Sequence, residues 1–417
     1  RYSVQSALGP GQNHYLEARV APGSLRKYSK MDFRTSIFGS VKVIKEENKS
    51  PVSLVAHFIK SRDTTSLSGM RSLRHGDYRE RIWKKDFKHL MRSLEVVDNG
   101  NSPALTGIDA ASCELGCRPE VLAPFFRSAR SGGIRNVTYH VGEDFYDVVD
   151  GLRAIDEALE FLEMRNGDRL GHAIAMGVDV SKYYSWRHRY LIIPMQELLD
   201  NVVWMKFRAM ELNVSLHPST MLFIMDCYTS LTEELGYGTS LSDALYWQGM
   251  KMRGENPIGR EIPAERQGKM VERLLDTYWN QVSTRKSGER TKSIRVPSSY
   301  VEDVIKLQEG MLGKVESKGV FIETNPTSNM RIGGFERYTD LPLFRFHSPG
   351  EGGWKLPVSI NTDDKGVFAT SLRNEYSLIA AAMWKEKDAQ GDRRWNDREI
   401  MDYLKRIADY GNMSRFR

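Results

Sequence analysis

Three places in this chain put imidazole or carboxylate side chains directly after a short apolar run. The side chains placed in this way are His140, Glu143, His172, Asp363 and Asp364. Neutral imidazole and carboxylate are ligands that zinc accepts, and a metal-bound water can become hydroxide near neutral pH. If the three places meet in the fold, they predict a hydrolytic metal site.

The residue types suggest a separate role for each side chain of this site. His140 and Asp363 are the candidate metal ligands. Glu143 lies three residues after His140, close enough to shuttle a proton at the same site. His172 can hold or accept the proton of the attacking water, and Asp364 can accept a hydrogen bond from a substrate.

Each motif also has a structural interpretation. A single histidine at the end of a strand is more often a hydrogen-bonded structural residue than a ligand, and an Asp-Asp pair alone is weaker still. Three such motifs, each after an apolar run, are much harder to obtain by accident. Their combination favours the metal site.

The elements that must position these side chains are short strands. Seven apolar or β-branched runs alternate with helical material, as in βα units around a parallel sheet. They span residues 15–21, 53–59, 105–111, 136–141, 168–172, 319–324 and 357–362. The pattern predicts an α/β fold of the (β/α)8 TIM-barrel type, which needs eight strands and gathers its site at their carboxyl ends. One crossover helix is expected over 144–163, opened by Asp144, with apolar residues at three-to-four spacing.

The stretch 174–318 breaks this rhythm and predicts an all-helical insertion. We expect barrel strands in 1–173 and again in 319–417. The expected helices of the insertion are 190–212, 218–235, 239–253, 263–281 and 299–316. Its Trp and Met residues are expected to form a core of its own. The basic stretch 283–295 is expected to be a solvated loop, with polyphosphate or RNA binding as the alternative.

Composition limits the class of protein. The chain has 417 residues, of which 40% are hydrophobic and 27% charged, as in ordinary globular proteins. Its net charge of +6 permits contact with phosphates without requiring a nucleic-acid partner. Three cysteines are too few for a disulfide framework, so we expect a reducing, cytoplasmic location. No apolar run is long enough for a membrane span.

Read in order, the strand-end motifs resemble the adenosine deaminase family of metal-dependent hydrolases. The family's His-Ala-Gly-Glu is similar to 140–143, its Gly-His to 171–172, and its Asn-Thr-Asp-Asp is matched letter for letter by 361–364. Softer similarities cover 15–22, 107–109 and 324–329. The resemblance extends over roughly 1–175 and 318–380.

The resemblance implies a reaction and roles for these residues. His140 and Asp363 would hold Zn²⁺, and His172 would orient and deprotonate the bound water. Glu143 would protonate the ring nitrogen next to the reacting carbon, and Asp364 would hold the far side of the purine. Ammonia would leave, giving an inosine-type product.

The sequence departs from the family in three respects. No two histidines are separated by one residue, so the family's His-x-His ligands from the first strand are absent, and we expect that strand upstream of this chain. Ser112 replaces the glycine whose backbone contacts the purine. The insertion is also larger than in housekeeping deaminases.

Large-insertion deaminases of this kind resemble the deaminase component of the bacterial RADAR anti-phage system, or the CRISPR-associated deaminases that act on ATP. That resemblance implies adenosine, ATP or adenosine in RNA as substrate. It also implies a large homo-oligomer and a partner ATPase of the same defence system. The rival from another class is a nucleic-acid-binding scaffold whose barrel has lost catalysis.

Overall fold

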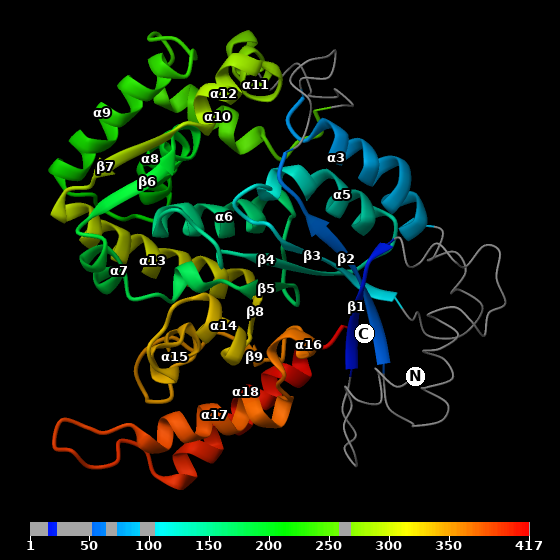
Figure 1. Ribbon diagram of the computed structural model, residues 1–417, viewed down its shortest axis with the longest axis vertical. Helices are drawn as coiled ribbons and strands as arrows, with labels where there is room; N and C mark the ends of the chain where they lie inside the picture. The colour runs from blue at the N-terminus through cyan, green and yellow to red at the C-terminus, as the bar shows by residue number, and fades with distance from the viewer. Residues whose placement is uncertain (1–15, 23–51, 64–72, 92–104, 258–267, 417) are drawn as a thin grey trace.

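Seven parallel strands form the central sheet of the protein. The structure is a computed structural model that describes residues 16–22, 52–63, 73–91, 105–257 and 268–416. The order of the strands in the sheet is β1-β2-β3-β4-β5-β8-β9, so β8 lies beside β5 and the chain makes β6 and β7 between them (Figure 1). The strands are β1 Leu16–Val20, β2 Val52–Lys60, β3 Leu105–Ser112, β4 Asn136–Val141, β5 Arg169–His172, β8 Phe321–Thr324 and β9 Val358–Ile360. They coincide with the seven predicted runs, which confirms those strands and the α/β class.

The sheet curls but does not close within the described residues. No pairing between β9 and β1 is seen in the described ranges, and no eighth strand there joins the sheet. Strands β4 and β5 are buried almost throughout, as expected for parallel strands covered on both faces. Closure by an eighth strand, and the division of the chain at 173 and 318, stay predictions.

Helices follow most strands and cover the sheet. The crossover helix α6 spans Val148–Phe161, so it begins four residues later than expected, after Asp147 rather than at Asp144. Its apolar positions, including Leu152 and Ile155, are fully buried as predicted. The other helices outside the insertion are α3 Gly76–Arg81 with a π-helical continuation Ile82–Phe87, α5 Pro119–Ser131, α14 Pro326–Ile332, α15 Pro342–Phe346, α16 Lys365–Phe368, α17 Leu372–Lys385 and α18 Asp397–Met413.

The segment between β5 and β8 is mainly helical, but the prediction of an all-helical insertion is wrong. Its helices are α7 Val180–Trp186, α8 Met195–Glu211, α9 Pro218–Glu234, α10 Asp243–Met252, α11 Lys269–Asn280, α12 Val282–Glu289 and α13 Ser298–Lys318. Between them, β6 Tyr190–Pro194 pairs antiparallel with β7 Thr291–Arg295. Residues 190–194 were expected to begin a helix. They form a strand because their partner is supplied by a segment about a hundred residues away.

The basic stretch 283–295 is therefore not a loop. It forms most of α12 and all of β7. Two of its cations are used within the protein, because Arg285 pairs with Asp63 at 2.5 Å and Lys292 pairs with Glu234 at 2.5 Å. The cations left for an external phosphate are fewer than the sequence suggested.

The hydrophobic core continues from the sheet into the insertion. Trp204, Met205 and Trp247 are buried as expected, but in the same cluster as the strands rather than in a core of their own. A small second cluster around Tyr278 and Trp279 lies apart from it. Within the described ranges, no helix combines the length and the apolar character needed to cross a bilayer.

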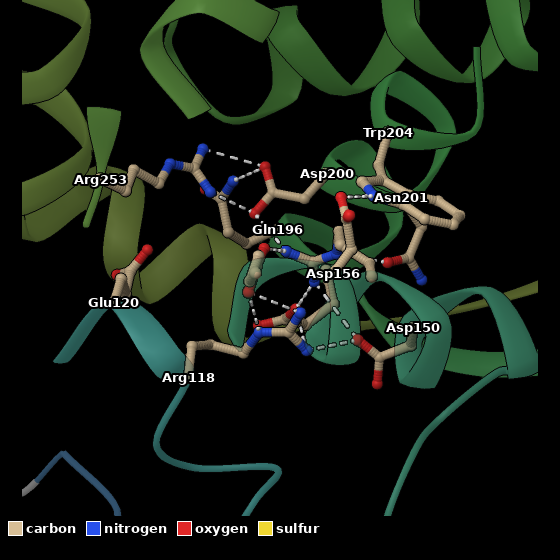
Figure 2. A network of polar contacts seen from close by, with 12 residues as sticks. Arg118, Glu120, Asp150, Asp156, Gln196, Asp200, Asn201, Trp204 and Arg253 are labelled. Carbon is tan, nitrogen blue, oxygen red and sulfur yellow. Dashed lines mark hydrogen bonds and ion pairs between the residues drawn. The ribbon is translucent and has the colours of Figure 1, made fainter. Parts of the chain in front are cut away.

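A buried network of charges joins the insertion to the helices that cover the sheet (Figure 2). Arg118, just before α5, contacts Asp150 of α6 at 2.8 Å and Glu157 of α6 at 2.9 Å. Arg253, after α10, contacts Asp200 of α8 at 2.5 Å. Arg153, Asp156, Trp204 and Asn201 extend the same network. Each of these three guanidinium groups lies against carboxylates, so the charges hold the layers together in a fixed arrangement.

Candidate active site

The ends of β4, β5 and β9 bring four of the predicted side chains together. His172 Nδ1 lies 3.1 Å from Glu143 Oε1, and His172 Nε2 lies 3.7 Å from Asp363 Oδ2. The rings of His140 and His172 have centroids 5.2 Å apart. These residues come from parts of the chain more than 200 positions apart, and they share one site because parallel strands end at one edge of the sheet.

A glycine beside His140 makes this approach feasible. In the pairing of β4 with β5, His140 is opposite Gly171. A Cβ atom at Gly171 would lie only 2.9 Å from Cγ of the His140 ring. Only a residue without a side chain therefore lets the His140 ring lie across β5.

Backbone strain concentrates at the same strand ends. His172 has φ 63°, Asp363 has φ 54° and Ser112 has φ 83°, values that residues with side chains seldom adopt. Such conformations cost about 1–3 kcal/mol each and persist where the surrounding structure imposes them, often at functional sites. The strain is an indication of function that does not depend on the identity of the side chains.

The surroundings of His140 fix its tautomer. Asp109 of β3 accepts from Nδ1 at 3.0 Å, and Arg19 of β1 donates to Nε2 at 2.8 Å. Asp109 also binds His57 at 2.7 Å. Burial alone would raise the pKa of Asp109, but Arg19, His140 and His57 together hold that pKa well below its usual value. The anionic Asp109 keeps the His140 proton on Nδ1, so Nε2 carries a lone pair.

Two asparagines orient His172. Nδ1 donates to Asn329 Oδ1 at 2.7 Å, and Asn325 donates to Nε2 at 3.2 Å. Glu143 Oε1 is close to Nδ1 but forms no hydrogen bond, because the single Nδ1 proton goes to Asn329. His172 Nε2 is therefore the unprotonated nitrogen. Its lone pair accepts the hydrogen bond from Asn325, and Asp363 Oδ2 lies 3.7 Å away.

Glu143 is an acid whose proton is retained at neutral pH. Burial, followed by the nearby charge of Glu114, raises its pKa to about 8, against a smaller opposing effect of His140. A carboxyl group with such a pKa can donate a proton near neutrality. Most carboxylates would be ionised under the same conditions.

Ion pairs of Glu323 with two arginines lie next to His140. Glu323 of β8 lies 2.6 Å from Arg19 and 2.9 Å from Arg169. Burial opposes ionisation of Glu323, yet Arg169 and Arg19 lower its pKa to about 2. Glu323 is therefore a fixed anion that holds Arg19 against His140.

The remaining two predicted residues, Asp364 and Ser112, are exposed. Asp364 is exposed, and its side chain accepts the backbone N–H of Val367 at 3.1 Å, at the start of α16. Ser112 is exposed at the end of β3. Its left-handed conformation explains why glycine suits this position. Their contacts with a substrate stay predictions.

The donors present fit a zinc ion in chemistry but do not complete its coordination. His140 has the tautomer that a ligand needs, with a carboxylate behind it, and Asp363 is a half-buried carboxylate nearby. Among the residues that the structure describes, no group of three His, Cys, Asp or Glu side chains is arranged to hold a metal ion. His140 and Asp363 stay the two candidate metal ligands.

Reasoning from the sequence missed several residues of this site. Asn325 and Asn329 follow β8 four positions apart, which places them on one face at the start of α14. That spacing was a usable signal. Asp109, Arg19 and Glu114 gave no comparable signal, since their role depends on contacts across neighbouring strands.

Comparison with known proteins finds deaminases. Residues 299–393, which include β8, both asparagines and Asp363, match the model of the family described as Adenosine deaminase. This part of the chain carries the sequence pattern of that family.

Three curated relatives are similar over short segments. An aminodeoxyfutalosine deaminase from Acidothermus cellulolyticus is 31% identical over 70 residues, 17% of this chain and 18% of the relative. An adenine deaminase from Sinorhizobium medicae is 33% identical over 73 residues, 18% of this chain and 21% of the relative. An adenosine deaminase from Plasmodium gallinaceum is 27% identical over 105 residues, 25% of each chain. The chain thus spans a quarter or less of the length of these relatives.

Two solved structures are also similar. An adenine deaminase from Arthrobacter aurescens has 12% identity and a TM-score of 0.38, covering 95% of this chain and 74% of its own. An amidohydrolase from Burkholderia ambifaria with bound Zn has 11% identity and a TM-score of 0.43, covering 97% of this chain and 63% of its own.

Proposed function

We propose that this protein removes the amino group of an adenine-type ring by hydrolysis at the strand-end site. The observation that carries the proposal is the position of His172 between Glu143, at 3.1 Å, and Asp363, at 3.7 Å, with the His140 ring beside it. A partly buried acid, an unprotonated imidazole nitrogen and ligand-type donors close together are the groups that such a hydrolysis requires. The match of residues 299–393 to the Adenosine deaminase family supports the choice of reaction.

His140 and Asp363 would hold zinc in this proposal. Zinc lowers the pKa of a water molecule and so makes it a nucleophile near neutral pH. Asp109 positions His140 for this role by accepting its Nδ1 proton at 3.0 Å. A zinc ion there would need further ligands beside these two.

His172 acts on the attacking water. Its Nε2 lone pair faces Asp363, and its ring is held by Asn329 at 2.7 Å. This nitrogen accepts the proton as the water oxygen bonds to the carbon that carries the amino group. Nε2 is the unprotonated nitrogen of this tautomer, and it acts as the base when the attacking water takes the place of the Asn325 N–H.

Glu143 supplies the proton that the ring needs. With its pKa raised to about 8 by burial and by Glu114, it is protonated at neutral pH. It donates to the ring nitrogen next to the reacting carbon, which lets the carbon accept the oxygen's electron pair. The carbon–nitrogen bond then breaks. Ammonia leaves with the water proton that His172 held, and the second water proton returns to Glu143 as the carbonyl forms. Asp364 and the backbone of Ser112 hold the ring in the proposal.

We further propose that the substrate carries phosphate. A phosphorylated adenine substrate, such as ATP or adenosine in RNA, is supported by exposed Arg62, which follows β2 and packs on Gly116 after β3. A guanidinium at this edge suits a phosphate group. A role in anti-phage defence, a homo-oligomer and a partner ATPase rest on the resemblance to large-insertion deaminases alone.

The test is identification of the product. The protein is incubated separately with adenosine, ATP and an adenosine-containing RNA, and each product is analysed by mass spectrometry together with ammonia release. The expected product has oxygen in place of the amino group in at least one incubation, and none forms with Glu143→Gln. Unchanged substrate in all three would overturn the proposal. Phage plating on cells with the wild type or Glu143→Gln tests the defence role.

A further inference from the structure

A second buried carboxylate, Glu114, lies directly behind the proposed acid. Glu114 follows β3, in the connection to α5, and is only 8% exposed. Its Oε2 accepts the backbone N–H of Glu143 at 3.1 Å and that of Asp144 at 3.4 Å. Its Oε1 is buried and has no hydrogen-bond partner among the residues that the structure describes. A buried carboxylate without a cation in contact is costly and needs an explanation.

The two hydrogen bonds fix the segment that carries Glu143. Gly142, with φ 75°, turns the chain sharply at the end of β4, and helix α6 begins only at Val148. Residues between these points have no strand or helix to hold them. The carboxylate of Glu114 binds two consecutive N–H groups there, so it sets the direction in which the Glu143 side chain leaves the backbone.

The same carboxylate places a negative charge beside Glu143. The charged and titratable groups that face Glu143 are Glu114 after β3, His140 of β4, Asp144 in its own segment, His172 of β5 and Asp363 after β9. Three of these five are carboxylates. Lys60 donates to the backbone carbonyl of His140, and no ion pair of Glu114 is seen in the part of the chain that the structure describes. A negative charge left unpaired so close by disfavours ionisation of Glu143.

We propose that Glu114 is a positioning residue for the reaction, which aims Glu143 through two backbone hydrogen bonds and keeps it protonated through its own negative charge. The inference rests on the proposed function, because it assigns a purpose to the proton on Glu143. Glu114 does not touch the reacting atoms. The alternative is a purely structural role, in which Glu114 holds the segment and its charge is irrelevant.

Two variants separate the effect of the two backbone hydrogen bonds of Glu114 from the effect of its negative charge. Glu114→Gln keeps an oxygen that can accept both N–H groups but removes the charge. Glu114→Ala removes both. Glu302→Gln, an exposed glutamate on α13, is the matched control for loss of a carboxylate.

The first readout needs no activity. Infrared titration follows the protonated carboxyl band of Glu143, assigned by its disappearance in Glu143→Gln. In Glu114→Gln the band should be lost about one pH unit lower than in the wild type, while Glu302→Gln leaves it unchanged. An unshifted band in Glu114→Gln would overturn the charge part of the proposal. Because no substrate is present, this result stands even if the proposed function fails.

The second readout is the pH profile of deamination. Loss of activity on the alkaline side should begin about one pH unit lower in Glu114→Gln, with little change in the maximal rate at lower pH. Glu114→Ala should show the same shift and also a maximal rate reduced by about tenfold or more, since a misaimed acid reacts poorly. Equal maximal rates in Glu114→Ala and Glu114→Gln would overturn the aiming role.

Discussion

Two buried polar regions of this protein are built on opposite principles. In the network between α6 and the insertion, Arg118, Arg153 and Arg253 each lie against carboxylates (Figure 2). At the strand ends, carboxyl groups lie beside one another, and Glu143 and Glu114 each keep a buried oxygen that has no hydrogen-bond partner within the described ranges. The network has charges of opposite sign in contact, whereas Glu143 and Glu114 are two carboxyl groups that lie together with no ion pair to a cation among the described residues.

The difference separates structure from function. Oppositely charged groups in contact stay ionised and fix one packing arrangement. Like charges and unpaired oxygens destabilise the fold locally and raise pKa values, which is useful only where a proton must be held and given up. The strained φ angles of His172 and Asp363 add to the same contrast. The strand ends are therefore the part of the molecule where stability is given up for chemistry.

The largest effect is expected when the proton donor is removed. Glu143→Gln keeps the shape of the side chain but cannot donate a carboxyl proton, so deamination should fall by about 10²–10⁴-fold. Ammonia release measures the rate, and circular dichroism checks the fold. Glu302→Gln on α13 should retain full activity. A variant with Glu143→Gln that turns over as fast as the wild type would remove Glu143 from the reaction.

A substitution in the buried network should lower the free energy of unfolding rather than the rate of deamination. The carboxylate of Asp200 lies 2.5 Å from Arg253 and 3.5 Å from Arg153. Asp200→Ala removes this carboxylate from both arginines. Breaking a buried pair in this way costs about 3–5 kcal/mol of unfolding free energy. Denaturant unfolding measures this loss, with exposed Asp226→Ala on α9 as the control. An unfolding free energy equal to that of the wild type would show that the network is not structural.

A methyl group at Gly171 should affect the site more than the fold. The added Cβ would meet the His140 ring at 2.9 Å and displace it. Misplacement of a reacting group by about 1 Å can cost about 10²-fold in rate. Gly268→Ala serves as the control, because nothing lies within 4 Å of its added Cβ. Zinc content should fall together with the rate in Gly171→Ala, and normal values of both would contradict the placement of His140.

The smallest effect is the dependence of the wild type on pH. The pKa of Glu143 is raised to about 8, so the group is protonated below that pH and ionised above it. Activity should therefore hold near neutrality and fall about tenfold per pH unit above 8. A rate that keeps rising with pH beyond this point would mean that the proton donor is another group.

The sequence predicted the elements better than it predicted the contacts. Seven strands were found because each is a short β-branched or apolar run that can be recognised from its own residues. β6 and β7 were missed because neither forms without the other, and their partner residues lie about a hundred positions apart. A local pattern does not contain that information.

The candidate site was predicted in the same uneven way. His140, His172 and Asp363 could be placed together because the ends of parallel strands meet at one edge. Asp109 and Glu114 could not, since an aspartate within a strand or a glutamate after it has no distinctive pattern. Their roles come from the side chains that the fold brings beside them.

One measurement tests the central claim most directly: anomalous diffraction at the zinc absorption edge from crystals of the zinc-loaded protein. A single strong peak is predicted about 2 Å from His140 Nε2 and from an Asp363 carboxylate oxygen, with Arg19 turned away from that nitrogen. A zinc peak at another place in the molecule, or none, would contradict a metal centre at these strand ends.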